Sequence, residues 1–243
     1  MKDTYFKLIS NKAIAKNTYE WVLEGDISDI TASGQFVNIK LDGFYLRRPI
    51  SVCDAENGKL ALIFKVVGEG TEKMAGMKEG ERVLVLTGLG NGYDLSKSGE
   101  TPLLLGGGAG IPPMYMLAKK LISEGKHPSV VLGFNSKDEV FYKAEFEALG
   151  IKTYVTTADG SEGIRGFVTD AMKDIAYSYF YTCGPEPMLK AVYNVSETSG
   201  QFSFEERMGC GFGACMGCSC KTKYGNKRIC RDGPVLEKEE IIW

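Results

Sequence analysis

Histidine is almost missing from this chain, which holds a single one among 243 residues, His127. Histidine is the side chain that most often moves protons near neutral pH, and nucleophilic triads usually depend on it. His127 lies between Lys126 and Pro128, in a predicted surface turn. We therefore expect no histidine-based acid–base or nucleophilic catalysis and assign no catalytic side chain. Hydride and electron transfer need no such residue, because cofactors carry them.

Long apolar runs and an excess of charge are missing as well. The run Leu103-Leu104-Leu105 breaks at once into glycine, so we expect no membrane-spanning helix. The first residues, Met1 to Phe6, lack the apolar segment of a signal peptide. A formal net charge of −2 gives no electrostatic reason to expect nucleic acid or an anionic membrane as a partner.

Cysteine, in contrast, is concentrated in one place, because five of the seven cysteines fall within residues 210–230. They read Cys210-x4-Cys215-x2-Cys218-x-Cys220, and Cys230 follows. The C-x4-C-x2-C…C spacing is typical of the plant-type [2Fe–2S] site, in which four thiolates hold two irons. Cys218 fits this spacing and Cys220 is interpreted as a bystander, although an exchange of the two roles stays open. Interleaved glycines allow a tight loop whose backbone N–H groups face sulfur: Gly209, Gly211, Gly213 and Gly217.

Zinc, disulfides and buried structural thiols account for this cysteine pattern less well. A structural zinc site usually pairs its ligands as two C-x2-4-C hooks, whereas this chain has one compact group and one distant cysteine. A disulfide framework suits short secreted proteins and not a chain of this length. Buried structural thiols would not cluster so tightly. Cysteines that serve as metal ligands also favour a reducing, cytoplasmic setting.

The first part of the chain, residues 1–99, is predicted to form an antiparallel β-barrel. Short β-rich runs at 36–41, 60–67 and 83–86 are separated by glycine-rich turns. The composition, with 44% hydrophobic and 25% charged residues, is that of a globular protein. Its length allows two compact domains and an appendage.

Residues 100–200 show a different pattern, in which strands alternate with helices and so predict a parallel-sheet α/β domain. The predicted strands are 103–105, 130–134, 151–155 and 179–182, and the predicted helices are 114–124, 142–149, 168–175 and 187–196. The cysteine-rich segment then forms a third, small module at 201–243.

Two loops of the second domain favour a nucleotide site. Residues 106–113, Gly-Gly-Gly-Ala-Gly-Ile-Pro-Pro, join the first strand to the first helix, where backbone amides and a helix N-terminus suit a pyrophosphate. Residues 182–188, Thr-Cys-Gly-Pro-Glu-Pro-Met, follow the last strand at the same sheet edge. A purely steric need for glycine and a buried thiol at 183 are the simpler alternatives. The predicted NAD(H) residues are Gly106, Gly107, Gly108, Ala109, Gly110, Cys183, Gly184 and Pro185.

The barrel carries two further motifs. In Arg48-Pro-Ile-Ser51 a guanidinium and a hydroxyl could reach a phosphate and a flavin, although a lone R-x-x-S string is common. In Lys65-Val-Val-Gly-Glu-Gly-Thr71 a glycine before the threonine exposes N–H groups that could hold a diphosphate.

Together these motifs resemble the ferredoxin–NADP reductase superfamily. The tail from Glu206 to Cys220, with Ile229-Cys-Arg-Asp-Gly-Pro-Val, looks like that of the iron–sulfur electron-transfer subunits of type B dihydroorotate dehydrogenases, and the resemblance spans nearly the whole chain. It implies FAD on the barrel and a [2Fe–2S] cluster on the module. It also implies an FMN-containing catalytic subunit as partner, in a complex of two copies of each. The FAD residues implied are Arg48, Pro49, Ile50, Ser51, Lys65, Val66, Val67, Gly70 and Thr71, and the cluster ligands implied are Cys210, Cys215, Cys218 and Cys230.

The expected function is thus an electron relay from NADH through FAD and the cluster to FMN on the partner, where dihydroorotate and orotate interconvert in pyrimidine synthesis. The alternatives are an NAD(P)H:ferredoxin oxidoreductase, the flavin subunit of a hydrogenase, and a non-enzymatic redox sensor or zinc-stapled module. Asp138 and Glu139 follow the second strand, and no arginine pair that could bind the 2′-phosphate of NADPH stands beside them. This favours NADH over NADPH. The alternative is that the two carboxylates belong to a solvated loop.

Overall fold

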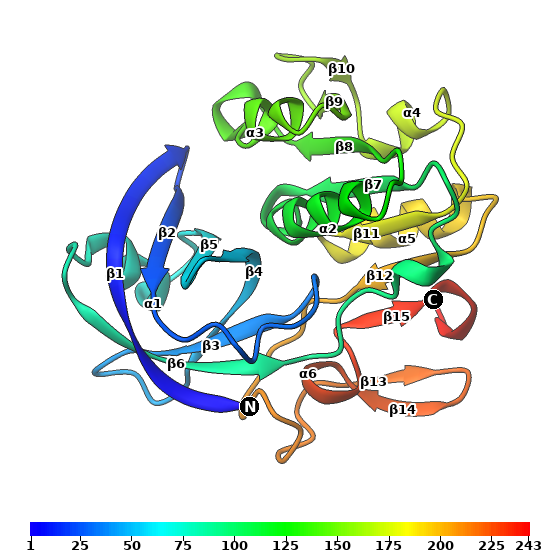
Figure 1. The fold of residues 1–243 in the computed structure, drawn as a ribbon. Coiled ribbons are helices and arrows are strands. Elements are labelled where there is room, and N and C mark those ends of the chain that lie inside the picture. The colour runs from blue at the N-terminus through cyan, green and yellow to red at the C-terminus, as the bar shows by residue number, and fades with distance from the viewer.

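A six-stranded barrel is built by the first 89 residues in the computed structural model, which describes residues 1–243. The strand order is β1-β2-β5-β4-β3-β6, and all neighbouring strands are antiparallel (Figure 1). The elements are β1 (Lys2–Ala15), β2 (Thr18–Glu24), β3 (Phe36–Lys40), β4 (Arg48–Glu56), β5 (Lys59–Lys65), α1 (Glu69–Gly76) and β6 (Arg82–Leu89). Alternate residues, such as Val83 and Val85 on β6, point into the barrel core. The predicted antiparallel barrel is confirmed.

The second sheet has seven strands in the order β10-β9-β8-β7-β11-β12-β15. All pairings are parallel except the last, between β12 and β15. Its strands are β7 (Leu103–Gly107), β8 (Ser129–Phe134), β9 (Lys152–Thr157), β10 (Ile164–Arg165), β11 (Phe180–Cys183), β12 (Gly200–Ser203) and β15 (Val235–Glu237). The parallel-sheet domain is therefore confirmed.

Helices cover both faces of this sheet. They are α2 (Pro112–Ser123), α3 (Lys143–Ala148), α4 (Val168–Met172) and α5 (Glu186–Val195). Helices α2 and α3 pack in one buried cluster and α4 and α5 in another, on opposite sides of β7. Single 3-10 turns complete the domain and its connections: η1 (Leu95–Lys97), η2 (Gly108–Gly110), η3 (Lys137–Glu139) and η4 (Lys238–Glu240). No helix of the chain combines the length and the apolarity needed to cross a bilayer.

The cysteine-rich segment leaves the sheet after β12 and returns to it as β15 (Figure 1). Between them lie the hairpin β13 (Ser219–Thr222) and β14 (Gly225–Arg228) and the short helix α6 (Ile229–Asp232). The domain limits at residues 99/100 and 200/201 stay predictions. The second of them falls inside β12, because the sheet continues into the C-terminal module.

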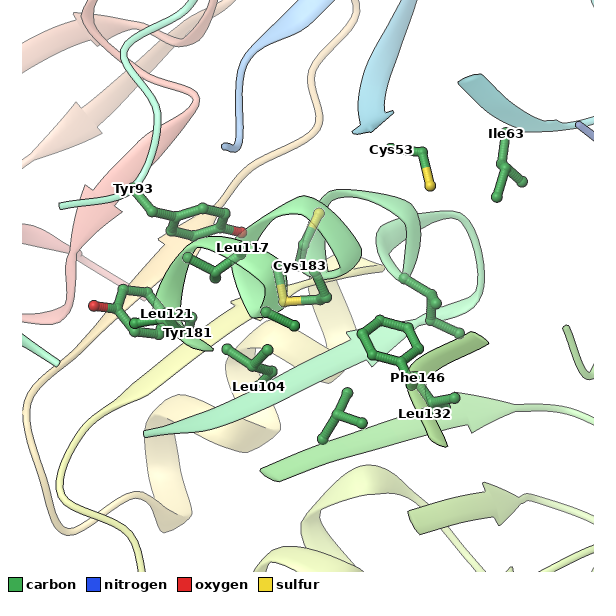
Figure 2. Close-up of a cluster of buried hydrophobic side chains, with 14 of the residues drawn as sticks. Cys53, Ile63, Tyr93, Leu104, Leu117, Leu121, Leu132, Phe146, Tyr181 and Cys183 are labelled. Atoms are coloured by element: carbon green, nitrogen blue, oxygen red, sulfur yellow. The ribbon is translucent and has the colours of Figure 1, made fainter. Parts of the chain in front are cut away.

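The barrel and the sheet share part of one buried core. Cys53 and Ile63 of the barrel face the helix that carries Leu117 and Leu121, and Leu104 of β7 lies beneath that helix (Figure 2). Polar contacts join the same two units, since Lys119 Nζ lies 2.7 Å from Asp54 Oδ2. The barrel is therefore held in place against the sheet.

The structure agrees with the expectation for His127 but adds elements that the sequence analysis did not predict. His127 is exposed in the connection between α2 and β8, as predicted. Helix α1 was not predicted from the sequence. It has only eight residues, between Gly68 and the extended Met77, and so short a helix gives a weak periodic signal. Strands β1 and β2 were also not foreseen.

Leu104→Ala should lower the free energy of unfolding by about 2–5 kcal/mol, because it leaves a cavity under α2 at a fully buried position. Urea unfolding of the cofactor-loaded chain measures this change. Ile164→Ala is the matched control, since Ile164 is exposed on β10 and a surface change usually stays within about 0.5 kcal/mol. Equal losses for both variants would contradict this assignment of the core.

Candidate functional site

A cavity of ≈ 360 Å³, which we call the barrel cavity, lies between the barrel, the glycine-rich loop and the C-terminal module. Seven of the nine predicted FAD residues line it: Arg48, Pro49, Ile50, Ser51, Lys65, Val67 and Thr71. The two others, Val66 and Gly70, do not. The backbone N–H of Val66 donates to the Asn17 carbonyl oxygen (2.7 Å), next to the first residue pair of β2 and β5.

Gly70 contributes by lacking a side chain. A Cβ built on it would lie 2.0 Å from Arg48 Nε, so the glycine lets the guanidinium lie against the first turn of α1. The guanidinium also lies over the Phe44 ring, 4.6 Å from its centroid. The first N–H groups of a helix lack intrahelical partners and carry a partial positive charge. A guanidinium beside such an end suits a diphosphate.

The hydroxyl of Thr71, a predicted FAD residue, bonds to the backbone of its own loop. Its hydroxyl oxygen accepts hydrogen bonds from the N–H groups of Val67 (2.9 Å) and Gly68 (3.2 Å) and donates to the Gly68 carbonyl (2.9 Å). The hydroxyl therefore holds the loop before α1 in shape, which leaves the first N–H groups of α1 and the Arg48 guanidinium as candidate donors to a phosphate.

A second cavity of ≈ 580 Å³, the sheet cavity, lies at the carboxyl edge of β7, β8 and β9. Four of the eight predicted NAD(H) residues line it, namely Gly107, Gly108, Ala109 and Pro185. Pro187 and Met188, of the predicted loop 182–188, line it as well. Sequence reasoning missed most of the remaining lining: Gly133, Phe134, Asn135, Thr156, Phe167, Val168, Thr169 and Ala191. Phe167 is 65% exposed at the start of α4, and an isolated aromatic residue in a loop gives no pattern that would have identified it.

The other four predicted NAD(H) residues lie outside that lining. A Cβ on Gly110 would lie 2.2 Å from the Cys183 carbonyl oxygen, so this glycine lets the two loops cross. A Cβ on Gly106 would lie 2.8 Å from Ile111 Cγ1. Cys183 is 1% exposed and burial raises the pKa of its thiol, which fits the simpler expectation of a buried thiol. Gly184 lines a separate cavity of ≈ 370 Å³.

The barrel cavity and the sheet cavity meet, because Lys65 and Ala109 line both. Lys65 Nζ lies 2.7 Å from Glu139 Oε1, and the Asn135 side-chain amide donates to the other oxygen of Glu139 (2.9 Å). Burial alone would raise the pKa of Glu139, but the bonds from Lys65 and Asn135 lower it overall. Glu139 is therefore engaged with the barrel, whereas Asp138 lines neither cavity.

The predicted cluster ligands lie on residues 209–218, which we call the cluster loop, and on α6. The N–H groups of Ala214 and Cys215 donate to Cys210 Sγ (3.2 and 3.4 Å), and the N–H of Cys230 donates to Cys218 Sγ (3.4 Å). A bond from a backbone N–H to sulfur thus joins the cysteines in two pairs, Cys210 with Cys215 and Cys218 with Cys230. No three His, Cys, Asp or Glu side chains form a group that could hold a single metal ion. Two pairs suit a cluster of two irons.

The electrostatics of the loop also suit thiolate ligands. Burial raises the pKa of Cys210, but backbone N–H groups, chiefly that of Cys215, outweigh it and lower the pKa to about 6. Gly211 and Gly213 have φ of +80° and +92°, which only glycine adopts readily. The donor set therefore fits a [2Fe–2S] cluster. Cys220 lines the ≈ 370 Å³ cavity, and its role as a bystander stays a prediction.

The same module completes the barrel cavity. Ser203, Phe204, Glu205, Glu206, Met208 and Pro234 line it from the C-terminal side. Phe36 of β3 lines the cavity too and belongs to the buried cluster that contains Cys218 and Cys230. Sequence reasoning missed these residues because it assigned the segment after 200 to the cluster alone.

Comparisons with known proteins agree with this geometry. Residues 205–242 match the family model for the iron–sulfur cluster binding domain of dihydroorotate dehydrogenase B, and residues 104–194 match that for the oxidoreductase NAD-binding domain. The electron transfer subunit of dihydroorotate dehydrogenase B (NAD+) from Fusobacterium nucleatum is 47% identical, over 95% of this chain and 95% of the relative. This chain belongs to that family of electron transfer subunits. The subunit from Bacillus pumilus is 44% identical, over 99% of this chain and 98% of its own.

Solved structures extend the likeness to the fold. That of an NADH-dependent reduced ferredoxin–NADP oxidoreductase has a TM-score of 0.88 and 31% identity, and it covers 98% of this chain and 90% of its own. A ferredoxin–NADP+ reductase from Neisseria gonorrhoeae with bound FAD and NADP shares the fold, with a TM-score of 0.69, 18% identity and coverage of 80% and 90%. The family of dihydroorotate dehydrogenase B electron transfer subunits, the flavin-type fold and the two domains fit FAD, an iron–sulfur cluster and NAD(H).

Gly70→Ala should weaken FAD binding about 10- to 100-fold, because the new methyl group displaces Arg48 and a charged hydrogen bond contributes about 1.5–3 kcal/mol. Titration of the apoprotein with FAD, followed by flavin fluorescence, measures the affinity. Alanine is the better helix former, so the variant should not unfold more easily.

Gly76→Ala is the matched control, since Gly76 ends the same helix and its Cβ would meet nothing within 4 Å. We expect unchanged FAD affinity for it. Wild-type affinity in Gly70→Ala would rule out a phosphate-binding role for Arg48 in this position.

Proposed function

We propose that this chain accepts electrons from NADH and delivers them singly to the catalytic subunit of a dihydroorotate dehydrogenase B in pyrimidine synthesis. The observation that carries the proposal is the order of the sites. The sheet cavity meets the barrel cavity at Lys65 and Ala109, and the module that bears the four thiols forms another wall of the barrel cavity. We infer that the three cofactor sites adjoin one another and form a continuous path.

Bound there, NAD(H) and FAD exchange a hydride, FAD can release electrons singly, and a [2Fe–2S] cluster carries one electron at a time. The chain's own residues bind and orient these groups. Arg48 and the N-terminus of α1 hold the diphosphate of FAD, while Pro49, Ile50 and Ser51 form the adjoining wall. Gly107, Gly108 and Pro185 bring backbone close to NAD(H). Cys210, Cys215, Cys218 and Cys230 serve as the ligands of the irons.

We propose that an FMN-containing partner docks at the cluster loop, and the exposed side chains of this loop support that site. The complex would hold two copies of each subunit, in the cytoplasm. Phe212 and Met216 lie between the ligand cysteines, and their side chains are 46% and 54% exposed. Exposed apolar side chains beside a redox centre are typical of a contact surface. We assign no catalytic side chain to this chain, and we infer that the acid–base chemistry on the pyrimidine belongs to the partner.

A second candidate is an NAD(P)H:ferredoxin oxidoreductase. The likeness over 98% of this chain to a structure described as an NADH-dependent reduced ferredoxin–NADP oxidoreductase favours it. Identification of the subunit that copurifies with the chain would separate the two candidates, since one predicts an FMN protein and the other a ferredoxin.

The division of labour has a direct test. We expect the purified, cofactor-loaded chain to reduce an artificial acceptor with NADH but to leave dihydroorotate unoxidised. Addition of the FMN subunit should restore NAD+-dependent oxidation of dihydroorotate. Oxidation of dihydroorotate by the chain alone would overturn the proposal. A higher turnover with NADPH than with NADH would overturn the choice of NADH as the nucleotide.

Serine substitutions at the thiols should separate ligands from bystander. Cys210→Ser, Cys215→Ser, Cys218→Ser or Cys230→Ser should lose the cluster signal and the relay, while FAD stays bound at the barrel. Cys220→Ser, as the matched control, should keep full iron content. Iron analysis and visible absorption measure the cluster content of each variant. If Cys220→Ser loses the cluster while Cys218→Ser keeps it, Cys220 is the ligand and Cys218 the bystander.

A further inference from the structure

Asn38 is an isolated polar residue in the middle of an apolar strand. Strand β3 reads Phe36-Val-Asn-Ile-Lys40, and Asn38 is 1% exposed within it. Val37 and Ile39 belong to the barrel core, so Asn38 points the other way, together with Phe36. A buried amide costs free energy unless it is hydrogen-bonded, so the contacts of this side chain decide what the position contributes.

The partner of this amide lies across the boundary with the C-terminal module. Asn38 Nδ2 donates to the carbonyl oxygen of Cys210 at 3.4 Å. The next residue, Gly211, has a φ of +80°, and a Cβ on it would lie 2.4 Å from Asn38 Nδ2. The cluster loop therefore lies directly on this amide. Asn38 Oδ1 is buried and has no hydrogen-bond partner, so the barrel core offers the amide no alternative contact.

The same stretch of β3 also borders the barrel cavity. Phe36, on the same face two residues earlier, lines that cavity. Pro49, which lines it as well, is the residue of β4 paired with Asn38. One side chain thus connects the wall of the candidate FAD site with the residue that carries the first cluster ligand.

We propose that Asn38 is a positioning residue that fixes the cluster loop against the barrel and tunes the reduction potential of the cluster through its amide dipole. The inference rests on the proposed function and deepens it. The N–H end of the amide points at the Cys210 backbone and favours additional negative charge on the cluster side. Hydrogen bonds and local charge around a cluster set its potential, and residues that orient metal ligands affect activity about 10- to 100-fold.

Three variants test the proposal in the holo chain, without partner or dihydroorotate. Asn38→Leu keeps the volume but removes the donor, and it also removes the unpartnered oxygen, so the fold should be no less stable. Asn38→Asp keeps the shape and places a carboxylate beside the Cys210 carbonyl. Asn38→Ser is too short to reach the loop. All should retain FAD, because the residues that line the barrel cavity are unchanged.

The readouts are the cluster midpoint potential in a reductive titration, the EPR signal of the reduced cluster, and the rate at which NADH-reduced flavin reduces it. We expect the midpoint to fall in the order wild type, Asn38→Leu, Asn38→Asp, with an altered EPR signal and a rate about tenfold or more below wild type. Asn226→Leu and Asn226→Asp are the controls, because Asn226 is exposed on β14 of the same module. They should behave as wild type.

Wild-type potentials, spectra and rates in Asn38→Leu and Asn38→Ser would overturn the proposal. If Asn38→Asp fails to load the cluster, these two variants decide the question. Equal shifts in the Asn226 variants would also overturn it, because a general charge or surface effect would then account for the result. If NADH fails to reduce the cluster of the wild-type chain, the proposed function is refuted instead. The comparison of midpoint potentials and EPR signals would still decide the role of Asn38.

Discussion

The antiparallel pairing of β12 with β15 is the constraint on which the arrangement of the sites depends. Its register places Ser203 opposite Val235, so the two ends of the cysteine-rich segment are fixed side by side on the nucleotide-binding sheet. The Phe204 N–H then donates to the Pro234 carbonyl oxygen (2.9 Å) and extends this base. From it, the segment covers the barrel cavity on its way to the cysteines. The pairing thereby holds the module with the candidate cluster ligands against the sheet that carries the candidate nucleotide site.

Glycine has two separate roles at these sites, and the sequence alone does not distinguish them. Gly108 lines the sheet cavity, and a Cβ on it would meet nothing within 4 Å, so its missing side chain leaves room for a ligand. Gly107 lines the same cavity, but a Cβ on it would lie 2.4 Å from Met188 Sδ, so it leaves room for that side chain. Gly110 and Gly70 leave room for the protein itself, for the Cys183 carbonyl and for the Arg48 guanidinium. A motif shows where glycine stands, whereas its role depends on what packs against it from another part of the chain.

The limits of prediction from this sequence follow the same division. The barrel and the parallel sheet were predictable, because strand periodicity and turns are local signals. Seven of the seventeen residues that line the barrel cavity were also predicted, and the resemblance to a known family implied them. The contributions of Phe36 and Phe204 were not, because they depend on contacts between segments far apart in sequence. The ion pair of Lys65 with Glu139 was missed for the same reason, since it joins residues predicted to contact different cofactors.

The return of the chain as β15 also changes the border of the sheet. Without it, β12 would present a row of unpaired backbone N–H and C=O groups, which are the groups through which sheets of separate molecules join. With it, the sheet ends in Val235–Glu237 on one side and in Ile164–Arg165 on the other, and such short edge strands are poor templates for further pairing. The segment that carries the cysteines therefore also protects the protein against edge-to-edge aggregation.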